Sequence, residues 1–394
     1  MLRILLIFGF VGILTSTIYL ALVFAATIRF RRRPKTLSAF TPPVSVLKPL
    51  QGAEPGLREY LEGFFQLDYP VYEILFCART ESDKGLAIAH ELSAKYPHIP
   101  VHILTSGEPP WPNAKCYSLN EMKAAACHDI LVISDSDVRV TPGYLRAVVE
   151  PFRDEKTGVV TCLYRGVAAQ GGFWAQLEGL GMSVEMTSGV LVAEMLEGMR
   201  FALGPSMVVR KRCVDQIGGF EILGDYHADD FMLGNLVSEK GNRVVLSDHV
   251  IDHCIVNTKF EKSLAHQWTW MKSTRFSRPM GHLGTGLTFG VSFGLLVFLA
   301  ASLLGRPWLG LAAMGWTVIA RVLQSVLVGW FVVRDNSAVR LACLYPFRDL
   351  MGALLWMASY SSRRFGWRGN LFEFTGRGVI RLVADNERRV SMNQ

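Results

Sequence analysis

Long apolar stretches lie near both ends of the chain and enclose a mixed middle region. The first, residues 4–28, contains no charged side chain. At 1.5 Å per residue, about 25 residues are long enough to cross a hydrocarbon core of roughly 30 Å. A basic cluster at 29–35 follows it directly, whereas a cleaved signal peptide would end in a small-residue cleavage site. We therefore predict a transmembrane helix whose N-terminus lies outside and whose following chain is cytosolic.

Three further apolar stretches follow the middle region, at 283–304, 308–333 and 341–360. The first two predict a hairpin of membrane spans. The third carries Arg348 and Asp349 near its middle, and charges in lipid are costly, so it is predicted to be interfacial or re-entrant. This topology keeps the Arg-rich C-terminal tail in the cytosol.

Between residues 42 and 279, short apolar runs alternate with segments of helical spacing. This alternation predicts an α/β domain on a mostly parallel sheet, with a Rossmann-like nucleotide-binding half. Ligands of such sheets gather at the carboxyl ends of the strands. The predicted strands are 44–47, 72–77, 102–104 and 130–133, and the predicted helices are 57–65, 84–96 and 118–127.

Composition narrows the class of partner. Half of the residues are hydrophobic and 19% are charged, and the net charge of +7 is spread along the membrane flanks. Anionic lipid is therefore the expected partner, and no nucleic acid is expected. The seven cysteines form no CxxC pair, which argues against a zinc site or a disulfide framework and fits reduced cytosolic thiols.

The first candidate chemical site is Asp135 and Asp137, which follow the most apolar of the predicted strands. Two carboxylates one residue apart offer the oxygen ligands that Mg²⁺ or Mn²⁺ prefers, and such a cation would hold a diphosphate. The alternative is a solvated turn. The position at a strand end favours the metal site.

The second candidate site is the pair Asp229 and Asp230 in the run ADDF. Adjacent carboxylates at a helix start also serve as favourable N-terminal charges, so a purely structural role is the alternative. In the functional interpretation, Asp230 is a general base that takes a proton from an acceptor hydroxyl.

Two further segments carry candidate binding groups. His266 and Trp270 precede the first C-terminal apolar stretch, where tryptophans anchor at membrane interfaces or stack on a sugar. Lys115, in the run PNAK before a predicted helix, has the charge to bind a phosphate or is simply solvated. The apolar, Met-rich stretch 171–199 forms either ordinary core or the floor of an acceptor groove.

Taken together, these pieces resemble the ceramide glucosyltransferase family of lipid glycosyltransferases and its bacterial relatives, which include hopanoid-associated glycosyltransferases. The likeness spans nearly the whole chain. The matching stretches are VSVLKPLQGAEPGL (44–57), FFQLDYPVYEILFC (64–77), PNAKCYSLN (112–120), ILVISDSDVRV (130–140), GVVTCLYRG (158–166), GGF (218–220), ADDF (228–231) and WRG (367–369).

The resemblance implies an inverting, UDP-sugar-dependent enzyme with a GT-A fold. It implies that Asp135 and Asp137 form the DxD metal motif and that Asp230 is the catalytic base. The residues that it assigns to the nucleotide-sugar are Pro49, Glu54, Asp83, Lys115, Asp135, Asp229, His266 and Trp270.

Two positions depart from the family pattern. The first family aspartate is replaced, and either Glu81 or Asp83 stands in for it. In the last motif, (Q/R)xxRW, His266 occupies the first position and Thr269 the arginine position. The charge that would steady the diphosphate must then come from His266, Lys272 or Arg275.

We therefore expect a multi-pass membrane protein, in a bacterial inner membrane, with a cytosolic catalytic domain. Its expected reaction moves a sugar, glucose by preference, from a UDP-sugar to a ceramide-type lipid hydroxyl with a divalent cation. The alternatives are UDP-N-acetylglucosamine-dependent transfer to a hopanoid, which the run at 161–166 and the HQxxW form favour, a processive polysaccharide synthase, and a catalytically weak scaffold. The expected domains are an anchor (1–30), a GT-A domain (40–280), membrane helices (281–361) and a cytosolic tail (362–394).

Overall fold

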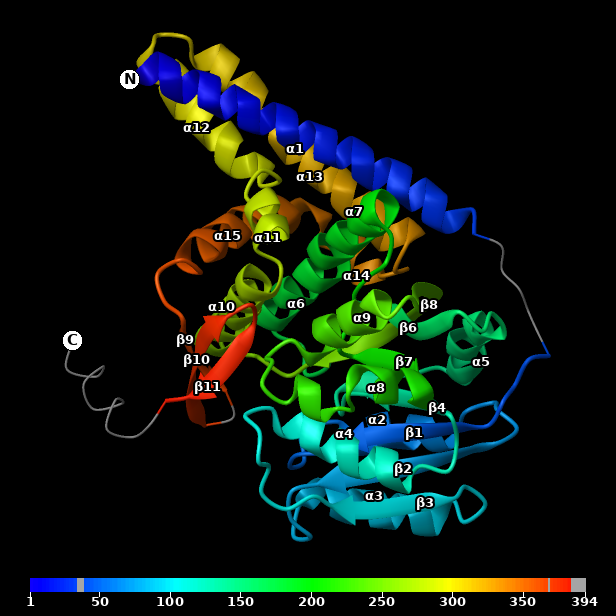
Figure 1. Cartoon of the computed structure of the whole chain (residues 1–394). Helices are drawn as coiled ribbons and strands as arrows, with labels where there is room; N and C mark the ends of the chain where they lie inside the picture. Colours follow the sequence, from blue (N-terminus) through cyan, green and yellow to red (C-terminus); the bar gives the residue numbers. More distant parts are fainter. Residues whose placement is uncertain (34–38, 368, 384–394) are drawn as a thin grey trace. The chain divides into compact units, whose positions relative to one another are not determined.

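The structure is a computed structural model that describes residues 1–33, 39–367 and 369–383 (Figure 1). Lys35 of the basic cluster and Arg368 of the tail lie outside the described residues. The chain divides into two compact units. The described parts of 34–170, 197–256 and 366–394 form what we call the sheet unit, and 1–33, 171–196 and 257–365 form the helical unit.

The first half of the sheet unit contains the four predicted strands. They are β1 (Val44–Pro49), β2 (Tyr72–Ala78), β3 (Val101–Thr105) and β4 (Ile130–Ser134), each one or two residues longer than predicted. They are parallel and lie in the order β3-β2-β1-β4. The α/β class expected for a GT-A domain is thus confirmed.

The second half of the same sheet is mixed, so the prediction of a mostly parallel sheet holds only for the first half. Next to β4 lies β7 (Ser206–Arg210), antiparallel to it and to β6 (Thr157–Ala168). β8 (Arg243–Ile255) is parallel to β6, and β5 (Val138–Arg139) closes the eight-stranded sheet antiparallel to β8. Local sequence patterns identify a strand but not its direction, which depends on the distant strand that it pairs with.

Helices cover both faces of the parallel strands. α4 (Ala114–Ala125), α8 (Lys211–Ile217) and α9 (Asp229–Glu239) pack on one face, around buried leucines of β1, β2 and β4. α2 (Leu57–Phe65) and α3 (Lys84–Lys95) cover the other, where Phe65 stacks on Phe76 with ring centroids 6.1 Å apart, while α5 (Tyr144–Val149) packs on β6 and β8. Burial on both faces explains why these strands are continuous apolar runs.

In the helical unit, three long apolar helices pack together: α1 (Leu2–Arg31), α12 (Gly290–Leu303) and α13 (Pro307–Phe331). Glycines permit their close approach, since a Cβ on Gly12 would lie 2.2 Å from the Phe293 ring and one on Gly310 would lie 2.7 Å from the Phe298 Cα. Small residues at such contacts are typical of membrane helices.

Among the described residues, α1 and α13 are long and apolar enough to cross a membrane. The stretch 283–304 was predicted to be one continuous span, but the structure breaks it into α11 (Pro279–Thr285) and α12, which are bent by 45°. Gly286 lies in the break, where a Cβ would come within 2.6 Å of the Trp356 ring. The two helices count as a third span if the bent pair crosses together.

The charged stretch near the C-terminus forms α15 (Tyr345–Ala358), after the short α14 (Asn336–Arg340). Its 14 residues reach about 21 Å, less than a hydrocarbon core of roughly 30 Å. Asp349 pairs with the fully buried Arg321 of α13 at 2.9 Å, and Arg348 pairs with Glu185 at 3.2 Å. Protein partners thus compensate both charges, and an interfacial or re-entrant position stays a prediction.

The Met-rich stretch 171–199 forms α6 (Phe173–Leu180), a π-helical turn (Gly181–Met186) and α7 (Thr187–Glu197), and much of it is buried. The remaining long helix of this unit is α10 (Phe260–Ser277). Burial among helices supports the core interpretation of this stretch, and an acceptor groove here remains a prediction.

The C-terminal segment forms a small three-stranded sheet of β9 (Arg364–Trp367), β10 (Asn370–Gly376) and β11 (Val379–Leu382). The Ile380 N–H donates to the Asp225 carbonyl at 2.8 Å, and Tyr226 forms an isolated bridge with Val379. These contacts hold the segment that leads into Asp229, so the tail helps to fix the position of the acidic pair.

Candidate active site

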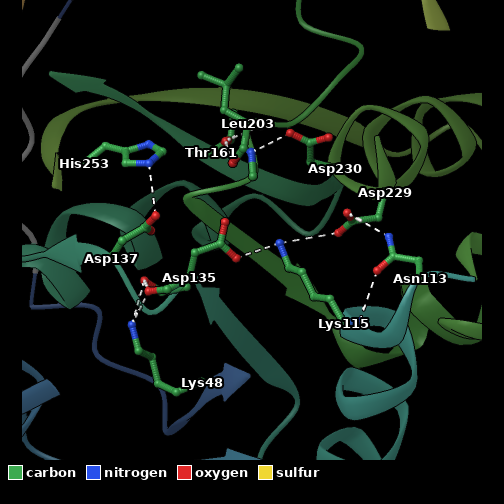
Figure 2. A network of polar contacts seen from close by, with 12 residues as sticks. Lys48, Asn113, Lys115, Asp135, Asp137, Thr161, Leu203, Asp229, Asp230 and His253 are labelled. Carbon is green, nitrogen blue, oxygen red and sulfur yellow. Dashed lines mark hydrogen bonds and ion pairs between the residues drawn. The ribbon is translucent and has the colours of Figure 1, made fainter. Parts of the chain in front are cut away.

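The carboxylates of the predicted DxD motif lie where β4 ends, at the carboxyl edge of the parallel strands (Figure 2). Asp135 and Asp137 flank Ser136 in the turn between β4 and β5. The Cys254 N–H of β8 donates to the Asp137 carbonyl at 2.8 Å, which fixes this turn against the second half of the sheet. The strand end thus presents two carboxylates at the place where open α/β sheets bind ligands.

Lys115 joins the two acidic sites. Its Nζ lies 2.7 Å from an Asp135 carboxylate oxygen and 3.5 Å from one of Asp229, as Figure 2 shows. Burial alone would lower the pKa of Lys115, but Asp135 and Asp229 outweigh it and raise the pKa well above its ordinary value. Lys115 is therefore a permanent cation between carboxylates about ninety residues apart in the sequence.

Asn113 orients this cation. Its side chain caps α4 by accepting from the Lys115 N–H at 3.1 Å. Its amide donates to the Tyr226 carbonyl at 2.9 Å and to Asp229 at 3.3 Å. Asn113 is fully buried, so these bonds replace water and fix the start of α9 relative to α4.

Asp230 lies beside the turn that precedes β7. Its carboxylate accepts from the Gly204 N–H at 2.6 Å (Figure 2). Thr161 of β6 holds that turn, since its hydroxyl accepts from the Leu203 N–H at 2.9 Å and donates to the Ser206 carbonyl at 2.8 Å. The base candidate is thereby held by a backbone donor that β6 positions.

Gly204 also shows that Asp135 and Asp230 converge. A Cβ on Gly204 would lie 3.1 Å from a carboxylate oxygen of Asp230 and 3.7 Å from one of Asp135. Both oxygens thus border the same point in space. The structure brings together Lys115, Asp135, Asp229 and Asp230, and their roles stay predictions.

The environment of Asp230 suits proton transfer. Burial, followed by the neighbouring charge of Asp229, raises its pKa to about 6, while Lys115 and the N–H groups of Phe231 and Gly204 oppose the shift. A carboxylate with a pKa near the working pH can both accept and release a proton.

The surroundings of Asp137 shift its pKa in the opposite direction. Burial would raise its pKa, but His253, whose Nε2 lies 3.1 Å from one oxygen, and then Lys48 outweigh it and lower the pKa to about 2. The other oxygen, Oδ1, is buried and receives no hydrogen bond from any residue that the structure describes. An ionised carboxylate with a buried, unsatisfied oxygen fits a metal ligand, because a divalent cation would complete its coordination. The donor set of Asp135 and Asp137 therefore fits Mg²⁺ or Mn²⁺, with phosphate and water oxygens as the remaining ligands.

Lys48 is not among the predicted site residues, but the structure places it next to the turn after β4. Its Nζ donates to the Asp135 carbonyl at 2.5 Å and lies 4.0 Å from the centre of the Phe64 ring. Burial lowers its pKa to about 7, against the raising effect of Asp135 and Asp137. The available signal was a lysine in the otherwise uncharged run VSVLKP, since an unpaired lysine is rarely fully buried. His253 and Gly204 were also missed, and no local pattern marks them.

Pro49, Glu54 and Asp83 lie in or next to the loops that follow β1 and β2. Pro49 ends β1, and Glu54 is exposed in the next loop. Asp83 caps α3 through the Gly85 N–H at 2.7 Å and also accepts from the Gly52 N–H at 2.8 Å. Asp83 thus ties the two loops together, whereas Glu81 is exposed. A role in nucleotide binding stays a prediction for all three.

His266 and Trp270 belong to the helical unit, on α10. The His266 Nδ1 lies 2.7 Å from the buried Glu178, and the His266 and Trp270 rings are 4.2 Å apart. Lys272 is fully buried against the Trp268 ring and donates to the Arg364 carbonyl at 2.5 Å.

Thr269 stands where the family motif has an arginine, and Lys272, Arg275 and His266 were the three predicted sources of the charge that this replacement removes. Their surroundings differ. Burial lowers the pKa of Lys272 to about 8. Arg275 donates to the Ser359 carbonyl at 2.7 Å and lies over the Tyr360 ring. His266 keeps 38% of its side chain exposed, whereas Lys272 is fully buried.

Comparison with known proteins gives one family over most of the chain. A family model described as "Glycosyl transferase family 21" matches residues 7–380. Ceramide glucosyltransferase 1 of Caenorhabditis elegans is 26% identical over 88% of this chain and 75% of its own length. Ceramide glucosyltransferase 3 of the same organism is 24% identical over 86% of this chain and 74% of its own length.

Among solved structures, a mannosyltransferase from Pyrobaculum calidifontis in complex with GDP-Man and Mn²⁺ superposes with a TM-score of 0.49. It is 15% identical in sequence, and the superposition covers 88% of this chain and 98% of that chain.

Proposed function

Because the chain belongs to glycosyl transferase family 21, the family of the ceramide glucosyltransferases, we propose that it moves a hexose from a UDP-sugar to the hydroxyl group of a membrane lipid. Glucose is the proposed sugar and a ceramide-type lipid the proposed acceptor. Membership of this family makes the chain a sugar-transferring enzyme.

One observation carries the proposed mechanism: oxygens of Asp135 and Asp230 border the same point beside Gly204, while Lys115 contacts Asp135 and Asp229. A nucleotide diphosphate at the carboxyl edge of β4 would meet Asp135, and an acceptor hydroxyl would meet Asp230. The carboxylates thereby have separate tasks, as their different environments indicate.

The reaction is a single displacement. The acceptor oxygen attacks the anomeric carbon of the sugar while the bond from that carbon to the UDP oxygen breaks, so the configuration inverts. The acceptor proton passes to Asp230, whose pKa of about 6 leaves most of the group ionised at neutral pH. A divalent cation held by Asp135 and Asp137 would supply the positive charge that the departing diphosphate needs.

Lys115 and Lys48 stabilise the arrangement on which this step depends. Lys115 keeps Asp135 and Asp229 close despite their like charge. Lys48 fixes the backbone of Asp135 from below through the carbonyl contact. Both effects hold the ligand carboxylates in place before the donor binds, which lowers the reorganisation needed during reaction.

A lipid acceptor is supported by the apolar helices. α1 ends in the basic residues that predict a cytosolic continuation, and α13 is a second candidate span. We propose that the sheet unit is cytosolic and receives an acceptor lipid that stays in the bilayer.

The test compares lipid extracts from cells that express the wild type, Asp230→Asn, Asp135→Ala or Asp215→Asn. Asp215 is an exposed carboxylate on α8 and serves as the matched control. We expect a new glycolipid with the wild type and the control, and at least a hundredfold less with the other two, in line with general-base contributions of about 10²–10⁴.

Mass spectrometry of the product then identifies the sugar and the lipid. A hexosylated ceramide is the expected product. An N-acetylhexosaminyl hopanoid would replace the proposed donor and acceptor but keep the mechanism. Near-normal product formation by Asp230→Asn membranes would contradict the assignment of the base.

A further inference from the structure

A second cluster of metal-ligating side chains lies at the opposite edge of the parallel strands. Glu73 is the second residue of β2, His102 is the second residue of β3, and Cys127 lies in the loop between α4 and β4. Each side chain offers one possible ligand atom, and these atoms all lie within 4.8 Å of one another. Three elements thus bring a carboxylate, an imidazole and a thiol to one place.

The carboxylate of this cluster is held by neighbouring groups. Glu73 is buried, and its Oε1 accepts from the Ser45 hydroxyl at 2.5 Å and from the Cys127 N–H at 2.7 Å. Ser45 in turn accepts from the His128 N–H at 3.1 Å. These bonds leave Oε2 directed at the His102 Nε2, 3.0 Å away. Metal-binding carboxylates are commonly oriented by such surrounding hydrogen bonds.

The geometry requires only a small adjustment to hold an ion. With Zn–N and Zn–O bonds of about 2.0–2.1 Å, a tetrahedral zinc site would place the His102 Nε2 and the Glu73 Oε2 about 3.3 Å apart. The observed contact is 3.0 Å, so it would open by about 0.3 Å. Cys127 is exposed and His102 is 41% exposed, so both can rotate, and water can take a fourth position.

The ligand types select the class of metal. Thiolate and imidazole are ligands of Zn²⁺ and its neighbours among the transition metals, whereas Mg²⁺ and Ca²⁺ prefer sites made of oxygen alone. On binding, the Cys127 proton leaves to solvent, and the charges of Glu73 and the thiolate balance those of the divalent ion. This donor set therefore differs in kind from the all-carboxylate pair Asp135 and Asp137.

We propose that Glu73, His102 and Cys127 form a Zn²⁺-class binding site that clamps the loop before β4 to the amino ends of β2 and β3. The site is separate from the diphosphate site. Ser45 pairs in register with Glu73 and Leu131 at this edge, and Asp135 lies four positions after Leu131, just past the end of β4. At a rise of about 3.3 Å per residue, that is about 13 Å, too far for one ion to serve both sites.

The site escapes sequence patterns because its ligands come from three separate elements and include no CxxC pair. Cysteine spacing speaks only against zinc motifs whose ligands are close in the sequence. The fold brings the three side chains together, although they are far apart in the sequence.

The test is cobalt titration of the purified, chelator-treated full-length protein in detergent, since Co²⁺ reports on the same ligands by absorption. We expect one equivalent of Co²⁺ to give a thiolate-to-cobalt charge-transfer band that Zn²⁺ abolishes. Cys127→Ser and His102→Gln should lose the band. Cys343→Ser, the other exposed cysteine, and His90→Gln, an exposed histidine of α3, should keep it.

A second readout measures stability. Zn²⁺ in about hundredfold excess over its Kd should raise the thermal midpoint of the wild type by about 2–4 °C and leave that of Cys127→Ser unchanged. Sugar transfer by Cys127→Ser should stay within about twofold of the wild type, because the site lies about 13 Å from Asp135. The absence of a charge-transfer band, its persistence in Cys127→Ser, or binding only at millimolar metal would overturn the proposal, whatever the outcome of the glycolipid assay.

Discussion

Replacing Gly204 with alanine should disturb the proposed base directly. The new Cβ would lie 3.1 Å from the Asp230 carboxylate, about 0.3 Å inside the 3.4 Å at which ordinary contact begins. Asp230 cannot retreat freely, because its 2.6 Å bond to the Gly204 N–H is made to the same residue. A charge-assisted bond of this kind contributes about 1.5–3 kcal/mol, and part of it would be lost.

A displacement of about 1 Å at a reacting group can cost roughly a hundredfold in rate. For the smaller shift at Gly204, we expect kcat to fall about tenfold, equivalent to about 1.4 kcal/mol in the barrier. The KM for the donor should change less than about twofold, because Asp135 makes only an ordinary 3.7 Å contact with the new atom.

The assay is transfer from radiolabelled UDP-sugar to lipid in membranes, with thermal unfolding of the purified variant alongside. Gly143→Ala is the matched control, because a Cβ there meets nothing within 4 Å. Wild-type turnover in Gly204→Ala would refute the argument that this turn positions Asp230. Equal impairment in Gly143→Ala would show that the loss is not specific to the site.

Three further predictions test the electrostatics of the two units. Below pH 6, kcat/KM should fall about tenfold per pH unit, because Asp230 must be ionised to accept a proton. Asp229→Asn removes a neighbouring negative charge and should therefore move this acidic limb of the pH profile to lower pH. An acidic limb that does not move would exclude Asp230 as its source. Chelation should abolish transfer, and Mn²⁺ or Mg²⁺ should restore it in the wild type but not in Asp135→Ala; transfer that survives chelation would rule out a metal-dependent step. Arg321→Met should lower the free energy of unfolding by about 3–5 kcal/mol, because it leaves Asp349 buried without its partner. Adding Asp349→Asn should recover much of that loss in denaturation assays. An equally unstable double variant would show that the broken pair is not the cause.

The sequence by itself determined the local elements and the chemistry at their ends. The four parallel strands are continuous apolar runs because both of their faces are buried, and such runs are visible in a short window. α2 begins and ends at the predicted residues, since its apolar face repeats with helical spacing. Asp135 could be predicted as a site residue for the same reason, because it directly follows an apolar strand, and Asp230 was singled out as one of two adjacent carboxylates, which the structure places in the first turn of α9.

Only the tertiary structure decided which distant groups meet. The direction of β7, the bend between α11 and α12, and the place of Lys48 under Asp135 depend on packing between segments far apart in the chain. The same holds for Gly204 beside Asp230 and for the cluster around Glu73. Periodicity records which face of an element is buried, but the partner that buries it is chosen by the free energy of the whole fold, which no local window contains.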